Sequence, residues 1–206
     1  MNSNYLVIAL ALFGGSVWAQ VGELYDAEVT DKTNINNPAK AVKAAEDQWL
    51  AFSMPVLEDT HSPCCWKGKW GATGQAGCSL EPGHTSYGSR SDSPLVDEVI
   101  VYAGIRDSHV YKLRVMGEQC PVDGNGARVT WIGSVDDKKG LDWLEDIARS
   151  DDSHGALYAL ALHRSDDAAK RLYSLARDTH EEPGSEAVFW LGEARGRQGF
   201  EQLQRL

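Results

Sequence analysis

The cysteines are the residues of this chain whose type and spacing could do chemistry. Cys64 and Cys65 are adjacent, and Cys78 and Cys120 follow further along the chain. An even number of cysteines in an oxidising compartment favours disulfides. A bridge between the two neighbours would close a strained ring, so each should bond either Cys78 or Cys120. Both of these pairings stay open, and either would tie the segment 58–94 to the strand that starts after Cys120.

A metal site is the alternative use of the same sulfur atoms. Five residues are dense enough to suggest zinc: His61, Cys64, Cys65, Cys78 and His84. Adjacent cysteines, however, differ from the C-x2-C spacing that tetrahedral zinc sites usually have. A C-x-x-C redox motif is also missing from the sequence. We therefore predict no metal and no cofactor.

Other residues that could do chemistry have structural explanations. The sequence contains neither an H-E-x-x-H motif nor a Gly-x-Ser-x-Gly motif. His163 and His180 lie near predicted helix ends, where capping explains them. The D-G-N-G run at 123–126 has oxygen atoms that suit calcium, but it lacks the downstream glutamate and therefore predicts a turn. We predict no catalytic residue.

Residues 1–19 have the pattern of a secretory signal peptide. Tyr5–Leu12 is an apolar run, and Val17-Trp18-Ala19 resembles a cleavage site before Gln20. The apolar run is too short to span a bilayer comfortably, so no stable membrane insertion is expected after cleavage. The net charge of −10 argues against binding to nucleic acid. We expect an exported protein, either periplasmic or secreted.

The elements around the cysteines must hold them in place. The stretch 58–94 is rich in Gly, Ser, Pro and Thr, which predicts a loop region. In Asp97–Gly104, Val99, Val101 and Ala103 alternate with Ile100, Tyr102 and Gly104, as side chains of a strand do. His109–Gly117 follows after a turn-like spacer, which predicts an antiparallel hairpin. Ala127–Val135 predicts a third strand. These strands would form a small β-containing domain that carries the cysteines.

Two features next to this domain stay open. Trp49–Val56 is either a strand or the end of a helix that starts at Pro38. Trp66 and Trp70 lie in the loop region, where two aromatic side chains are either core residues or a contact patch.

The C-terminal part predicts helices in a repeated pattern. A helix over Gly140–Arg149 is followed by Ala156–Leu175, which aligns without a gap with Ala187–Leu206 at a shift of 31 residues. Such a period is typical of stacked two-helix repeats. The helices predicted are Ala156–His163, Asp166–Arg177, Ala187–Arg195 and Arg197–Leu206. Because about three units are usually needed for stability, these helices should lean on the preceding domain.

The same segments carry a resemblance to a known family. The runs "ALYALALHRSDDAAKRLYSLARD" and "SEAVFWLGEARGRQGFEQL" resemble the HEAT repeats of exported bacterial HEAT repeat domain-containing proteins. Phe189-Trp190-Leu191-Gly192 matches the end of a first repeat helix, and Cys120–Val135 is similar to the domain that precedes such repeats. The resemblance implies a right-handed α-solenoid whose inner helices bind a protein partner.

The inner helices would be Asp166–Arg177 and Arg197–Leu206. Their exposed candidates for protein binding are Lys170, Arg171, Tyr173, Gln202 and Arg205. Phe200 and Leu203 should be left unstacked at the open C-terminal end, where a partner or a second copy could bind.

These observations predict an α+β fold in three parts. A signal peptide at 1–19 precedes a small disulfide-stapled, β-containing domain at 20–136, and a C-terminal solenoid-like, HEAT-like helical array follows at 137–206. The predicted function is that of an exported, non-enzymatic protein-interaction module. The alternative is a small-ligand-binding or hydrolytic protein with a site between the cysteine-rich loop and the first repeat. A purely structural envelope component is a third hypothesis.

Overall fold

The computed structural model describes residues 22–44, 46, 48–66, 78–81, 86–88, 91–150, 154–178 and 182–206. The predicted signal peptide at 1–19 lies outside the described residues, as do Trp70, His84 and His180. The side chains of Cys65 and Trp66 lie outside them as well. The predictions made for these residues therefore stay predictions.

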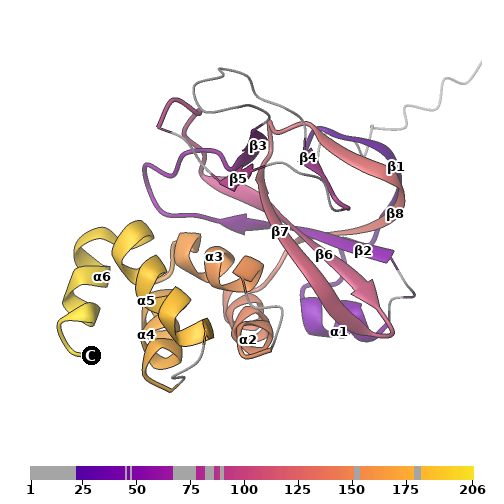
Figure 1. Ribbon diagram of the computed structural model, residues 1–206. Coiled ribbons are helices and arrows are strands. Elements are labelled where there is room, and N and C mark those ends of the chain that lie inside the picture. Colours follow the sequence, from indigo (N-terminus) through magenta and orange to yellow (C-terminus); the bar gives the residue numbers. More distant parts are fainter. Residues whose placement is uncertain are drawn as a thin grey trace, which may run out of the picture.

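A mixed six-stranded sheet forms the N-terminal half of the molecule (Figure 1). Its strand order is β1-β8-β2-β6-β7, with β4 paired to β8. Strand β8 is parallel to β1, β2 and β4, whereas β6 is antiparallel to β2 and β7. Two short strands, β3 and β5, pair separately. The strands span Leu24–Asp31 (β1), Gln48–Pro55 (β2), Cys64–Trp66 (β3), Cys78–Ser79 (β4), Ser86–Gly88 (β5), Glu98–Arg106 (β6), His109–Gly117 (β7) and Val122–Ser134 (β8).

The central strands are buried on both faces of the sheet. In β2, Leu50 and Phe52 belong to the core shared with the helices, whereas Trp49 and Ala51 belong to a second core that contains the cysteines. The alternation follows from the two-residue period of a strand. The open prediction for Trp49–Val56 is thus resolved in favour of a strand.

A short helix, α1 (Pro38–Lys43), precedes β2. Asn37 caps its N-terminus by accepting a hydrogen bond from the backbone N–H of Lys40 at 3.2 Å. The predicted helix that starts at Pro38 is therefore present, but it ends before the strand begins.

The predicted hairpin is confirmed by the antiparallel pairing of β6 and β7. Asp107 and Ser108 form its two-residue turn with φ values of 51° and 61°. Positive φ at both positions is the signature of a type I′ turn, whose twist matches the strands on either side.

The third predicted strand is confirmed as β8, but the turn predicted at 123–126 is wrong. Strand β8 already begins at Val122, and its pairing with β1 shifts register between Tyr25 and Ala27. The extra residues of β8 form a bulge, in which Asn125 has a positive φ of 56°. Turn-forming residues therefore serve here to bend a long strand rather than to end it.

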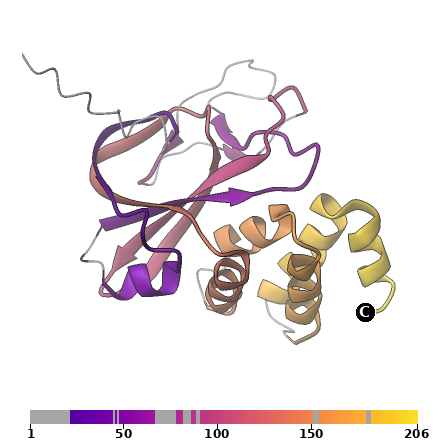
Figure 2. The same ribbon diagram turned by 180° about the vertical axis from the view of Figure 1, so that it is seen from behind.

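Five helices follow the sheet in the described part of the chain and lie on one side of it, with α5 and α6 farther from the strands than α2 and α3 (Figures 1 and 2). They are α2 (Asp137–Ala148), α3 (His154–Leu162), α4 (Asp166–Asp178), α5 (Glu182–Ala194) and α6 (Gly196–Leu203). Residues 156–162 of α3 are all buried, as expected for a helix that is apolar all round. Among the described residues, no helix is long and apolar enough to cross a membrane.

The predicted HEAT-like solenoid is wrong, because the helices are not an array of repeats. The two helices that would be equivalent in such an array have different surroundings. Helix α3 packs against β7 and is buried all round, whereas α5 shares the same core only through one face and exposes Val188 and Phe189. In α4 and α6, the 31-residue match reflects the amphipathic spacing that any packed surface helix requires.

The chain instead combines a mixed sheet with helices in an α/β-like arrangement. The predicted boundary between residues 136 and 137 coincides with the start of α2. The main hydrophobic core nevertheless includes side chains from both sides of that boundary, such as Phe52 and Leu157. The prediction that the helices lean on the preceding residues is therefore confirmed.

Candidate functional site

Three cysteines, Cys64, Cys78 and Cys120, belong to the second core. Strands β3 and β4, which contain the first two, lie on the side of the sheet away from the helices (Figure 1). Cys64 Sγ is bonded to Cys120 Sγ at 2.04 Å, and Cys78 is also disulfide-bonded. The predicted staple is therefore confirmed for Cys64 and Cys120, and it ties β3 to the segment before β8. This bond matches the predicted pairing that leaves Cys65 for Cys78, although the side chain of Cys65 lies outside the described residues.

The sulfur atoms of this cluster are closely packed. Cys78 Sγ lies 3.7 Å from Cys120 Sγ and 3.3 Å from Met116 Sδ. Zinc binds cysteine as the thiolate, so sulfur atoms held in disulfides are not ligands for it. His61, another residue of the zinc alternative, has its Nδ1 2.7 Å from the carbonyl oxygen of Ser93. In this oxidised state the cluster cross-links the second core.

The residues predicted to bind a protein have different surroundings in the structure. Lys170 is exposed on α4, with its Nζ 3.9 Å from the Asp167 carboxylate. Tyr173 and Arg205 do meet, because the Tyr173 hydroxyl donates a hydrogen bond to the Arg205 carbonyl at 3.2 Å. Gln202 is half-buried on α6.

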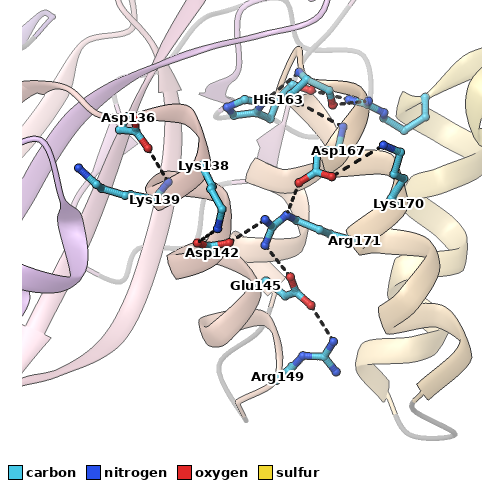
Figure 3. A network of polar contacts seen from close by, with 12 residues as sticks. Asp136, Lys138, Lys139, Asp142, Glu145, Arg149, His163, Asp167, Lys170 and Arg171 are labelled. Atoms are coloured by element: carbon cyan, nitrogen blue, oxygen red, sulfur yellow. Dashed lines mark hydrogen bonds and ion pairs between the residues drawn. The ribbon is translucent and has the colours of Figure 1, made fainter.

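Arg171 has a different role from the other predicted residues, because it joins α4 to α2 (Figure 3). Its guanidinium donates hydrogen bonds to Asp142 and Glu145 of α2, both at 2.7 Å, and to Asp167 of α4 at 3.0 Å. Hydrogen bonds from Lys138 and Arg171 hold the pKa of Asp142 below its usual value. Arg171 is therefore an internal clamp between two helices.

His163 lies where the helices join the sheet. Its side chain is 2% exposed, and its Nδ1 accepts a hydrogen bond from the Ser165 backbone N–H at 3.1 Å. Burial lowers the pKa of His163 to about 4, although the Asp137 carboxylate, 3.9 Å from Nε2, opposes this shift. The ring is therefore neutral at neutral pH and acts as a hydrogen-bond acceptor.

Arg195, between α5 and α6, is a buried charged residue that was not predicted from the sequence. Its side chain is only 4% exposed, and it donates hydrogen bonds to the carbonyls of Ala161, His163 and Ser165. These carbonyls lie at the end of α3, where backbone acceptors lack helical partners and a cation complements the helix dipole. The sequence placed Arg195 at a helix end but gave no signal that it would be buried.

A cleft of about 700 Å³ opens beside this junction. One wall comes from the segment after β2 and from the residue that precedes β6, and the other from the turns that end α3 and α5. Glu58 and Asp97 line the first wall, and Arg164 and Arg195 line the second. Because these residues are far apart in the sequence, no local motif could have predicted the cleft. The remaining lining residues are Val56, Leu57, Ala194 and Gly196.

A group of exposed apolar side chains, called here the apolar surface, is the other candidate site. Four of the six large hydrophobic residues that are exposed in the described part of the chain lie in its last stretch: Val188, Phe189, Phe200 and Leu206. The prediction that Phe200 would be left unstacked is confirmed by its exposed fraction of 58%. Leu203, in contrast, is half-buried and packs against the main core.

The rings of this surface are continuous with the core. Phe189 lies 5.0 Å from Trp190 between ring centroids, and Trp190 lies 4.7 Å from the buried Tyr158 of α3. The Trp190 indole N–H also donates a hydrogen bond to Glu186 at 3.0 Å. Phe189 is thus the solvent end of a row of three packed rings.

No family model, no curated protein and no solved structure matches this chain. The resemblance to exported HEAT repeat proteins therefore stays a prediction. The two candidate sites, the charged cleft and the exposed apolar surface, are therefore the basis for proposing a function.

Proposed function

We propose that this chain is an exported, non-enzymatic protein-interaction module that binds a protein partner through α5 and α6. The observation that carries the proposal is the exposure of Phe189 and Phe200, which are 56% and 58% accessible to solvent. Exposed apolar patches on a soluble protein commonly mark interaction sites. Aromatic side chains in particular are enriched at the centres of protein interfaces.

The local packing supports Phe189 as an anchor. Its ring rests on Trp190, which is fixed by Tyr158 on one side and by the hydrogen bond to Glu186 on the other. A side chain that is already ordered loses less conformational entropy when a partner covers it. Charged residues such as Arg197 and Glu201 lie nearby in the sequence on α6 and would form a polar rim.

Export is part of the same proposal. The signal-peptide pattern of residues 1–19 motivates it, and the disulfide between Cys64 and Cys120 supports it. Disulfides persist in the periplasm and outside the cell, whereas cytosolic thiols are usually kept reduced.

The test replaces both rings with a small polar residue, in the variant Phe189→Ser/Phe200→Ser. Leu95→Ser is the matched control, because Leu95 is 57% exposed but lies far from α5 and α6 in the sequence. Affinity capture from an envelope extract should yield a protein that binds the wild-type chain and the control but is lost with the double variant. Equal capture by all three chains, with unchanged circular dichroism, would contradict the proposal.

A further inference from the structure

The charged cleft beside His163 is a preformed site, because backbone hydrogen bonds fix its two walls to each other. The Leu57 N–H donates to the Leu162 carbonyl at 2.9 Å, and the Arg164 N–H donates to the Pro55 carbonyl at 3.2 Å. On the sheet side, the Val56 N–H donates to the Asp97 carbonyl at 2.9 Å. The separation of the walls is therefore set by the fold before any ligand arrives.

The two walls carry opposite charges that do not neutralise each other. Glu58 and Asp97 are exposed on the sheet side, and Arg164 is exposed on the helical side. Among the residues that the structure describes, none of these three side chains forms an ion pair. Surface charges of opposite sign around one cleft leave room for a ligand that brings both complementary charges.

The helical wall has two further features that favour an anionic group. Helix α6 begins at Gly196, and its N-cap residue Arg195 makes no side-chain capping bond, so the first backbone N–H groups keep their positive partial charge at the cleft. Arg195 also places its buried guanidinium in this wall, and its positive charge acts on the cleft without direct contact, because its Nε is shielded from solvent.

The chemistry of the lining selects among ligands. A phosphate or another simple anion would meet Glu58 and Asp97, and a polyamine would meet Arg164. A molecule with a cationic and an anionic end satisfies both walls, and Val56, Leu57 and Ala194 add apolar lining to them. A volume of about 700 Å³ lies within the usual range of small-molecule sites, roughly 300–1,000 Å³.

We infer that this cleft binds a short peptide by its free ends, with the ammonium group toward Glu58 and Asp97 and the carboxylate toward Arg164 and the N-terminus of α6. This site is distinct from the apolar surface of α5 and α6 proposed above to bind a protein. A small-ligand site between the cysteine-rich loop and the first predicted repeat is the alternative function that the sequence predicts. The cleft is our candidate for such a site.

The test is calorimetric titration of the full chain with trialanine, N-acetyl-trialanine and trialanine amide. Saturable binding of one trialanine per chain is expected, and blocking either end should weaken it by about tenfold or more, as expected for the loss of one charge-assisted contact. Arg164→Gln should lose the preference for the free carboxylate, and Glu58→Gln/Asp97→Asn should lose the preference for the free amine.

Arg197→Gln is the matched control, because Arg197 is exposed on α6 but does not line the cleft. This control and Phe189→Ser/Phe200→Ser should bind trialanine as the wild type does, which keeps the test separate from that of the protein-binding surface. The inference is overturned if trialanine does not bind in the millimolar range. It is equally overturned if the blocked peptides bind as well, or if Arg197→Gln weakens binding as much as Arg164→Gln.

Discussion

His163 is the side chain whose charge state the fold controls most strongly. Its pKa falls to about 4 because it is buried, and Arg195, Arg164 and Arg171 add to this shift while Asp137 opposes it. Its ordinary pKa is 6.5, so between these two values the unfolded chain binds a proton that the folded chain does not. The part of the folding stability that depends on a neutral His163 is therefore fully present above pH 6.5, and it is lost as the pH falls toward 4.

We expect this one residue to contribute about 3 kcal/mol of that acid-dependent loss, since each pKa unit corresponds to roughly 1.4 kcal/mol. In His163→Asn the amide oxygen can still accept from the Ser165 N–H but cannot titrate in this range. Urea unfolding between pH 4 and 7 should show a shallower pH dependence for this variant than for the wild type. His109→Asn, at an exposed histidine, is the control. If the unfolding free energy changes equally with pH in all three chains, His163 is not the source of the acid-dependent loss.

The structural roles of several residues could be predicted from the sequence, because these roles depend on local features. The disulfide role of the cysteines was predicted from their number and their context, and the exposure of Phe200 from its place in the last predicted helix. Arg171 was predicted to be exposed, but its position on α4 says nothing about the carboxylates of α2 that bind it. The same limit applies to Arg195, whose carbonyl partners belong to another helix and the turn after it.

At the scale of elements, the contact between α5 and α6 depends on one glycine. A Cβ built on Gly199 would lie 1.7 Å from the Leu191 carbonyl oxygen, a distance that no real Cβ can tolerate. Gly192, also within a helix, is exposed, and a Cβ there would meet only the end of the Leu203 side chain at 3.6 Å. The two glycines therefore have opposite structural roles.

We expect Gly199→Ala to destabilise the protein by about 1–3 kcal/mol, because α6 must move away from α5. Gly192→Ala should instead be neutral or stabilising by up to about 1 kcal/mol, because alanine favours the helix. Thermal unfolding followed by circular dichroism measures both changes. If Gly199→Ala is as stable as Gly192→Ala, the close approach of the two helices is not required for folding.

The elements themselves were predictable where one pattern dominates. The hairpin of β6 and β7 could be predicted because two strand-like apolar runs are separated by a turn-like spacer. Strand β8 was predicted too short, because its bulge contains the residues that usually form turns, such as Asn125 and Gly126. The mistaken repeat has a similar cause: the spacing of apolar residues in α4 and α6 reports which face is buried but not what covers it.

At the scale of the whole molecule, the sheet and the helices share one hydrophobic core. Leu157 of α3 is fully buried in the same cluster as Phe52 of β2 and Val101 of β6. A core that spans both parts should make them unfold together as one cooperative unit.

Leu157→Ala tests this coupling, because it removes a side chain at the centre of the shared core. We expect a loss of about 3 kcal/mol, and a single unfolding transition whose midpoint is the same for tryptophan fluorescence and for helical circular dichroism. Leu95→Ala, at an exposed position, should change stability little. Separate transitions, with the helices unfolding first, would show instead that residues 137–206 form an independent unit.

The place of β8 in the sheet also bears on how the chain folds as it is made. Leu24 in β1 pairs with Val122, and Trp49 in β2 pairs with Val129. A chain that leaves the ribosome amino end first therefore presents β1 and β2 long before the strand that lies between them exists. Pairings so distant in sequence form slowly, and unpaired strand edges are prone to aggregate meanwhile. The sheet of this protein should thus assemble only after residue 134 has left the ribosome. Until then, we expect the nascent chain to benefit from chaperones that hold unfolded chains.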